Sequence, residues 1–128
     1  MRMIKVGSKG KVENIVNSSN TANRVGSGTL EVFSTPMMIA LMENAAINAI
    51  ELPKEQSSVG ISIDIKHIAA TPIGMKVWAE AEVLEVDGRR IVFKIEAYDE
   101  IEKIGEGRHE RYIINNEKFL AKANSKLG

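Results

Sequence analysis

The sequence PMMIALMENAAINAI, residues 36–50, is the stretch that decides the fold of this chain. Its side chains are almost all apolar, and only Glu43, Asn44 and Asn48 interrupt them. A helix that is apolar around its whole circumference is normally buried by the rest of the protein. An ionised carboxylate in such a helix is costly unless it is paired, hydrogen-bonded or used in chemistry, so Glu43 marks a candidate site.

The expected helix has recognisable ends. Thr35 could accept hydrogen bonds from the first free amides, Ser34 is an alternative cap, and Pro36 suits the first helical turn. The apolar pattern continues to about Glu51 and stops at Leu52–Pro53. The helix should therefore have about four turns and a length of roughly 24 Å.

From Ser57 onward, apolar residues recur at every second position, which is typical of half-buried strands. In the first of these strands Val59 and His67 share one parity with three isoleucines, and this parity is expected to face inward. Gly60 has the opposite parity and is expected to face outward. Asp87–Gly88 predicts a tight hairpin between the next two strands. The expected strands span Lys9–Val16, Ser57–His67, Met75–Val86, Arg90–Tyr98 and Ile104–Ile114.

These elements predict an α+β protein. Asn17–Gly28 is rich in Asn, Ser, Thr and Gly and should form a loop over the surface or near the mouth of a site, and Thr29–Phe33 leads into the helix. One antiparallel sheet must bury its apolar face, and one apolar helix is available to cover it. We expect residues 1–128 to form one domain in which a curved antiparallel sheet wraps one long central helix, as in the hot-dog fold. A second subunit should cover the rest of the helix, so we expect a homodimer.

The composition restricts the classes of function. The chain has 128 residues with 17 basic and 17 acidic side chains, so no net charge favours nucleic acid or an acidic membrane surface. It has no cysteine, which excludes disulfides and thiolate chemistry, and its 2 histidines are too few for most histidine-rich metal sites. Neither a signal peptide nor a run of roughly 18 apolar residues is present. We expect a cytoplasmic protein with no metal, no cofactor and no nucleic-acid or membrane partner.

Several residues of the helix and first inner strand could carry chemistry. Glu43 follows Thr35 by eight positions, which is about 12 Å along a helix, so the two side chains could flank a substrate without touching. Thr35 could instead be only a cap, and Glu43 a structural carboxylate or part of a dimer interface. His67 can relay protons near neutral pH, although a histidine on an apolar face is more often a core residue. Gly60 could mark a bulge or a close approach of a ligand to the backbone.

Residues 105–111 read GEGRHER, in which glycine alternates with polar side chains. This is not a phosphate loop, because no strand–glycine–helix unit surrounds it. His109 and Arg111 share one strand face, and Arg108 and Glu110 share the other. The pattern fits a solvated strand with cross-strand ion pairs, or an arginine that binds a carbonyl or phosphate group.

The motifs of the chain resemble the fluoroacetyl-CoA thioesterase branch of the hot-dog thioesterases. The resemblance extends over Glu31–Lys122, most of the sequence. Its most specific pieces are HIAATP at 67–72 and IGEGRHER at 104–111. The other pieces are EVFSTP at 31–36, IALMENA at 39–45, SVG at 58–60 and DGRR at 87–90.

The resemblance implies roles for individual residues. Thr35, Glu43 and His67 match the catalytic threonine, glutamate and histidine of that family. The family's lid phenylalanines have no counterpart, because Asn17–Gly28 contains no aromatic residue, so fluoroacetyl specificity is not expected. Three substrate-binding positions also match: the phenylalanine before the catalytic threonine, a glycine whose amide contacts the thioester and an arginine near the active site, here Phe33, Gly60 and Arg111.

The resulting hypothesis is hydrolysis of a small or medium acyl-CoA thioester, with coenzyme A as part of the substrate. Glu43 would act as nucleophile or as the base that positions water, and His67 would move the proton. Thr35 would orient the carboxylate or the substrate carbonyl, and the Gly60 amide would bind the oxyanion. Two other functions stay open: a module that binds an acyl-CoA or another apolar ligand without turnover, and a structural dimer with a buried Glu43–His67 pair.

Overall fold

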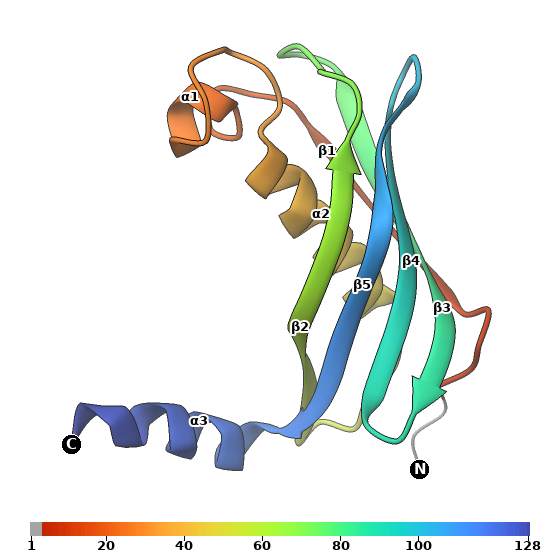
Figure 1. Cartoon of the computed structure of the whole chain (residues 1–128), viewed down its shortest axis with the longest axis vertical. Helices are drawn as coiled ribbons and strands as arrows, with labels where there is room; N and C mark the ends of the chain where they lie inside the picture. The colour runs from red at the N-terminus through yellow and green to blue at the C-terminus, as the bar shows by residue number, and fades with distance from the viewer. Residues whose placement is uncertain (1–3) are drawn as a thin grey trace.

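The computed structural model describes residues 4–128, which contain one five-stranded antiparallel sheet with helices beside it (Figure 1). The strand order is β1-β3-β4-β5-β2, so β1 and β2 form the two edges. The α+β class expected from the sequence is confirmed. The strands are β1 (Lys9–Ile15), β2 (Gln56–His67), β3 (Lys76–Asp87), β4 (Arg90–Asp99) and β5 (Lys103–Asn115). The helices are α1 (Ala22–Val25), α2 (Thr35–Asn48) and α3 (Asn116–Asn124), followed by a short 3-10 turn, η1 (Ser125–Leu127).

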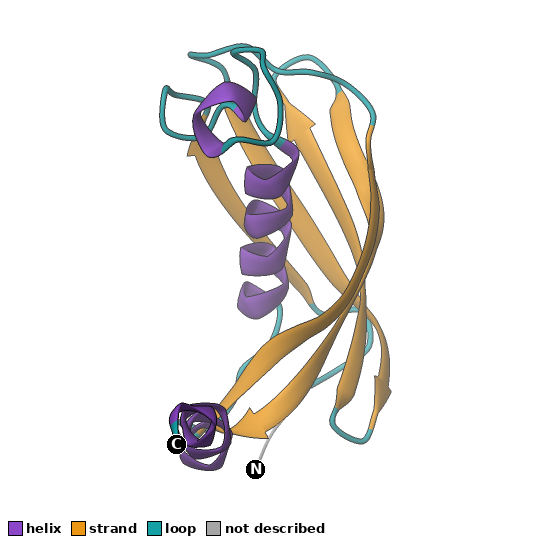
Figure 2. Cartoon of the chain, turned by 60° about the vertical axis from the view of Figure 1, so that its left-hand side comes forward, coloured by secondary structure: helices purple, strands orange, loops and turns teal. Residues whose placement is uncertain are grey.

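The sheet curves around one side of α2 (Figure 2). The inward side chains of β3 and β4 are buried at every second position, as their alternation predicts. Gly10 on β1 lets that strand and the helix approach closely, because a Cβ atom there would collide with the backbone at Ala45 and Ala49. The buried face of α2 consists of Met38, Leu41, Met42, Ala45 and Ala46.

The opposite side of α2 is uncovered in the single chain (Figure 2). The apolar sequence of α2 predicts a helix that is buried on all sides. Within this single chain, the sheet covers only one side of it. Apart from the partly exposed Glu43, the remaining side is apolar or uncharged, which is compatible with cover by a second subunit. Its exposed residues are Pro36, Ala40, Asn44, Ile47 and Asn48.

A bulge in β2 changes which residues face the helix. The pairing of β2 with β5 sets Gly60 opposite Arg111 and resumes at Ser62, so Ile61 is an extra residue. The inward positions therefore switch from even to odd numbers at the bulge. Gly60 faces inward together with Arg111, and the expectation that it faces outward is wrong. His67 faces inward, as predicted, because it lies beyond the bulge.

Some element boundaries differ from the sequence prediction. α2 ends at Asn48 rather than near Glu51, because the amides of Ala49 and Ile50 donate hydrogen bonds to carbonyls three residues earlier instead of four. The expected loop 17–28 contains the one-turn helix α1, and the lead-in segment 29–33 forms only isolated bridges. The sequence did not predict α3, which extends away from the sheet (Figure 1). No helix within residues 4–128 is both long and apolar enough to span a membrane.

Candidate active site

Thr35 begins α2, and its hydroxyl oxygen lies 2.7 Å from Nδ1 of His67. The cap of α2 is the preceding residue, Ser34, whose Oγ accepts a hydrogen bond from the amide of Met37 at 3.2 Å. The interpretation of Thr35 as the cap is therefore wrong, and the alternative cap, Ser34, is confirmed. The Thr35 hydroxyl is consequently available for a side-chain hydrogen bond with the histidine.

His67 ends β2 on the face that turns toward α2. Burial lowers the pKa of His67 below its usual value, and the backbone of Ala69 raises it in part. The ring is therefore neutral at pH 7. Its Nε2 atom is buried, and no side chain within residues 4–128 bonds to it. A neutral imidazole held by a hydroxyl at one nitrogen is suited to moving a proton at the other.

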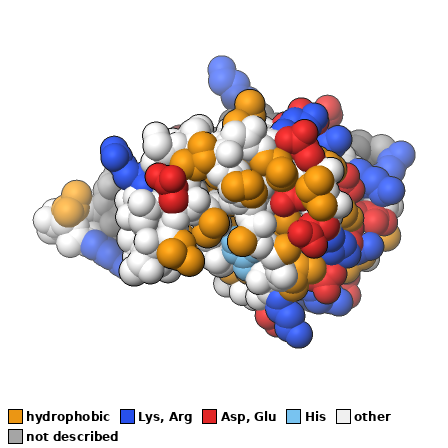
Figure 3. Space-filling model, turned by 90° about the horizontal axis from the view of Figure 1, so that it is seen from above, with side chains coloured by type: hydrophobic (Ala, Val, Ile, Leu, Met, Phe, Trp, Pro, Cys, Tyr) orange, Lys and Arg blue, Asp and Glu red, His pale blue; other side chains and the backbone are white. Residues whose placement is uncertain are grey.

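A cavity of about 340 Å³ opens beside this pair. Its walls include Phe33, Thr35 and His67, together with Ala22 and Ser27 from the segment expected near the mouth of a site. Seen from above, hydrophobic side chains surround histidine surface at this end of the molecule (Figure 3). The cavity and its surroundings can therefore accept an apolar group. Exposed apolar residues in the loops near this end include Leu30, Ile68, Ile73 and Ile101.

Glu43 lies two turns farther along α2 and belongs to a second cluster. Its Oε2 atom is 3.6 Å from Nη1 of Arg111 and 4.0 Å from Nε2 of His109. Gly60 faces the same oxygen, because a Cβ atom at that position would lie 2.7 Å from it. The Glu43 side chain is 40% exposed, so it is not the buried carboxylate that the apolar helix predicts. It is instead an accessible carboxylate set against the backbone of β2.

Arg111 is held in place by β2. Its Nε donates to Oγ of Ser58 at 2.7 Å, and its Nη2 donates to the carbonyl of Ser58 at 2.8 Å. Burial lowers the pKa of Arg111 and the charge of Glu43 raises it, while a guanidinium remains protonated at neutral pH. The residue is 5% exposed, so it is a fixed cation at the site rather than a solvated strand residue.

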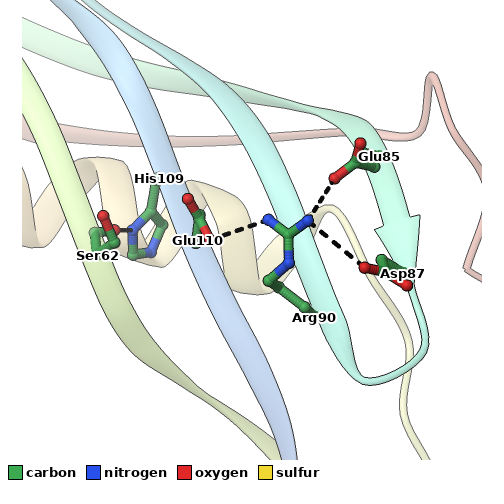
Figure 4. Close-up of polar contacts among 6 residues, drawn as sticks. All are labelled: Ser62, Glu85, Asp87, Arg90, His109 and Glu110. Atoms are coloured by element: carbon green, nitrogen blue, oxygen red, sulfur yellow. Dashed lines mark hydrogen bonds and ion pairs between the residues drawn. The ribbon is translucent and has the colours of Figure 1, made fainter.

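His109 was not predicted as a site residue, although it shares a strand face with Arg111. It is 1% exposed, and its ring nitrogens contact the carbonyl of Ser62 and Nη1 of Arg111. The parity that it shares with Arg111 is the signal that could have identified it. On the outer face of the same strand, the expected ion pairs are present: Arg90 bonds Glu110 and Glu85 (Figure 4).

The two clusters lie at different points along α2. Thr35 and Glu43 stand on one helix ridge with Ile39 between them, and eight residues of helix separate them by about 12 Å. Between Glu43 and His67 the described part of the chain forms neither a hydrogen bond nor an ion pair. A Glu43–His67 pair is therefore not formed within one chain, and the structural alternative would need the pair to form between two copies.

Comparison with known proteins agrees with this fold. Residues 16–117 match the family of fluoroacetyl-CoA-specific thioesterases. The chain is 43% identical over 98 residues to the fluoroacetyl-CoA thioesterase of Streptantibioticus cattleyicolor. The aligned region covers 75% of this chain and 70% of that protein. A solved fluoroacetyl-CoA thioesterase has 35% identity and a TM-score of 0.91, covering 97% of this chain and 98% of the other. A hot-dog-like protein from Thermanaerovibrio acidaminovorans, 23% identical, has a TM-score of 0.86 over 98% of this chain and 94% of its own, which supports the fold alone. The chain has the hot-dog fold and belongs to the fluoroacetyl-CoA-specific thioesterase family.

Proposed function

We propose that this protein hydrolyses the thioester of a small or medium acyl-CoA. The observation that carries the proposal is the accessible carboxylate of Glu43, set against Gly60 and beside the fixed cation of Arg111. Thioester hydrolysis is also the activity named for its relative from Streptantibioticus cattleyicolor. In the reaction, water adds to the carbonyl carbon, the carbon–sulfur bond breaks, and the products are a carboxylic acid and the free thiol of coenzyme A.

The roles of the side chains follow from their surroundings. Glu43 either attacks the carbonyl carbon or removes a proton from the attacking water. The Gly60 amide binds the developing oxyanion, and a donor of that kind can be worth roughly 3 kcal/mol. His67, neutral and held by Thr35, exchanges a proton with water or with the leaving thiolate. Arg111 attracts and orients the Glu43 carboxylate at 3.6 Å.

We further propose that the working unit is a homodimer in which two copies of α2 lie antiparallel. Thr35 and Glu43 stand four positions on either side of Ile39. A twofold axis near Ile39 and the exposed, small Ala40 would bring Thr35 and His67 of one copy beside Glu43 of the other. The free edge of β2, with Ile61 53% exposed, can extend the same interface. The site would then take half of its groups from each copy.

The acyl group should enter the cavity of about 340 Å³ beside Thr35. Its lining from the 22–27 segment consists of the small side chains Ala22 and Ser27. Because this segment has no aromatic lid residue, we propose acyl groups other than fluoroacetyl as the preferred substrates. A cytoplasmic location and the use of no separate cofactor stay predictions, which cell fractionation and activity of metal-free protein would test.

The test is thiol release from a panel running from acetyl-CoA and fluoroacetyl-CoA to medium-chain acyl-CoAs. Wild type is compared with Glu43→Gln and with a control, Glu80→Gln, on an exposed position of β3. Wild type and control should release thiol, and Glu43→Gln should be slower by roughly a hundredfold. Near-normal turnover by Glu43→Gln would refute the role of the carboxylate. Tight binding of acyl-CoA without release by wild type would establish the binding module instead.

A further inference from the structure

Arg111 is immobilised on three sides before any substrate arrives. A guanidinium has five N–H donors and no acceptor. Nε and Nη2 donate to the two oxygens of Ser58, and Nη1 lies 3.1 Å from Nε2 of His109. All three acceptors come from β2 and β5, so the strands and not the helix fix this side chain. His109 supplies the acceptor nearest to Glu43.

The hydrogen bonds of His109 determine where its proton is. Nδ1 lies 2.8 Å from the carbonyl oxygen of Ser62, which can only accept, so Nδ1 carries the proton (Figure 4). Nε2 therefore has a lone pair, and Arg111 donates to it. Burial lowers the pKa of His109, and the charge of Arg111 lowers it further, which agrees with a neutral ring. The ring also stacks on Phe93, with centroids 6.0 Å apart.

This arrangement keeps Arg111 near Glu43 without closing an ion pair on it. Nη1 is 3.6 Å from Oε2, which is longer than a hydrogen bond. Arginine and carboxylate groups that are free to move tend to form short bidentate pairs, which occupy both carboxylate oxygens. Within residues 4–128, no group donates a hydrogen bond to the Glu43 carboxylate. Its oxygens therefore stay available for a thioester or a water molecule.

We propose that His109 is a positioning residue whose Nε2 lone pair holds Arg111 on the sheet, so that the guanidinium orients Glu43 without occupying it. This inference rests on the proposed thioesterase function. When the acceptor is lost, Nε and Nη2 keep their bonds to Ser58, but Nη1 is free to close the 3.6 Å distance to Glu43 and to quench the carboxylate by direct pairing. The chemical step slows, whereas binding of the acyl-CoA is little changed.

Two substitutions at His109 separate positioning from packing. His109→Gln keeps an acceptor that cannot be protonated, and His109→Leu keeps an apolar side chain of similar bulk without an acceptor. His109→Leu should lower kcat on the order of tenfold with nearly unchanged KM, while His109→Gln stays within about threefold of wild type. A packing control is Phe93→Leu, which removes the stacked ring but leaves the Arg111 acceptor, and it should retain kcat. Thermal unfolding confirms that each variant is folded.

A spectroscopic measurement tests the arrangement without turnover. Nitrogen NMR of histidine-labelled protein, assigned with His67→Gln, should show His109 as the neutral Nδ1–H tautomer at neutral pH. The other tautomer, or a charged ring, would overturn the inference. Equal kcat in wild type and His109→Leu, or an equal loss in His109→Gln and His109→Leu, would also overturn it while leaving the thioesterase proposal intact. If wild type releases no thiol from any acyl-CoA, the proposed function fails, and the role of His109 in turnover fails with it.

Discussion

The Thr35 hydroxyl and Nδ1 of His67 lie 2.7 Å apart and join the first residue of α2 to the last residue of β2. This contact is possible because Ser34 satisfies the free amide at the start of the helix. Neighbouring hydroxyl residues thus have separate roles, one in the helix cap and one at the histidine. The two roles can be separated by substitution.

Thr35→Val should lower kcat for thiol release on the order of tenfold, because the hydroxyl at His67 is lost and the volume is kept. Thr35→Ser should retain most of the activity, since it keeps the hydroxyl. Ser34→Ala is the matched control: it should reduce the free energy of unfolding by about 1 kcal/mol while leaving kcat nearly unchanged. Urea denaturation and steady-state kinetics of the three variants check this. The reverse assignment, with kcat sensitive to Ser34 and insensitive to Thr35, would contradict it.

Gly60→Ala should abolish most of the activity without unfolding the protein. The added Cβ atom would lie 2.7 Å from Oε2 of Glu43 and 3.2 Å from Cε1 of His109, so the carboxylate must move away from the backbone of β2. We expect a fall in kcat of roughly a hundredfold, the magnitude attributed to the loss of a positioned catalytic base, because the alanine keeps the backbone amide but displaces the carboxylate. Ser62→Ala, two positions along the same strand on the outer face, should behave as wild type. Equal activity of Gly60→Ala and Ser62→Ala would show that the close approach is unimportant.

The Gly60 position also shows what the sequence can and cannot predict. The apolar periods of α2, β3 and β4 predict the helix, the sheet and the buried faces, because burial of those side chains decides local structure. The apolar period gives no sign of the bulge at Ile61, since isoleucines continue at every second position through it, and the neighbouring Gly60 is its one mark in the sequence. Its effect on parity, which sets Gly60 opposite Arg111 on the inner face, arises from pairing with β5 and is invisible in one strand alone.

The candidate site, too, could be predicted from the sequence only in part. Glu43 stands out in the sequence because a carboxylate interrupts an apolar helix, and the structure sets it beside Gly60 and Arg111, although partly exposed rather than buried. The contact of His67 with Thr35 and of Glu43 with Arg111 depends on how strands and helix meet in space, so spacing alone could not pair them. The parity that His109 shares with Arg111 places the two on one strand face, but the strand alone does not show which of its faces is covered.

Stability should fall as the pH drops from about 7 to about 5.5. Burial lowers the pKa of His67 and of His109 in the folded protein, whereas histidines in the unfolded chain have pKa values of about 6.5. Above that pH, both states are neutral and the two histidines have no effect. Below it, the unfolded chain binds protons first, so the free energy of unfolding decreases. Urea denaturation at the two pH values measures the difference, and His109→Gln should reduce it. A pH-independent free energy in wild type would contradict the prediction.

The proposed dimer predicts that two inactive variants restore each other. Glu43→Gln and His67→Gln should each be nearly inactive alone, because each lacks one group from every site. In a mixed dimer, one site combines both altered residues and the other combines the intact Glu43 of one copy with the intact Thr35 and His67 of its partner. After subunit exchange, roughly a quarter of the wild-type sites should be complete. Thiol release by the mixture, compared with each variant alone, measures this recovery.

As the control for complementation, each variant is taken through the same subunit-exchange procedure by itself. Both copies of every dimer then carry the same substitution, so the sample should stay inactive. Sedimentation should give twice the chain mass of 14.1 kDa for wild type and for both variants. Ala40→Arg, at the exposed position proposed to lie near the twofold axis, should reduce that mass and the activity together, because a long charged side chain keeps the two helices apart. A dimer that exchanges subunits but recovers no activity would show that each chain builds its site alone, with the substrate spanning the distance between Thr35 and Glu43.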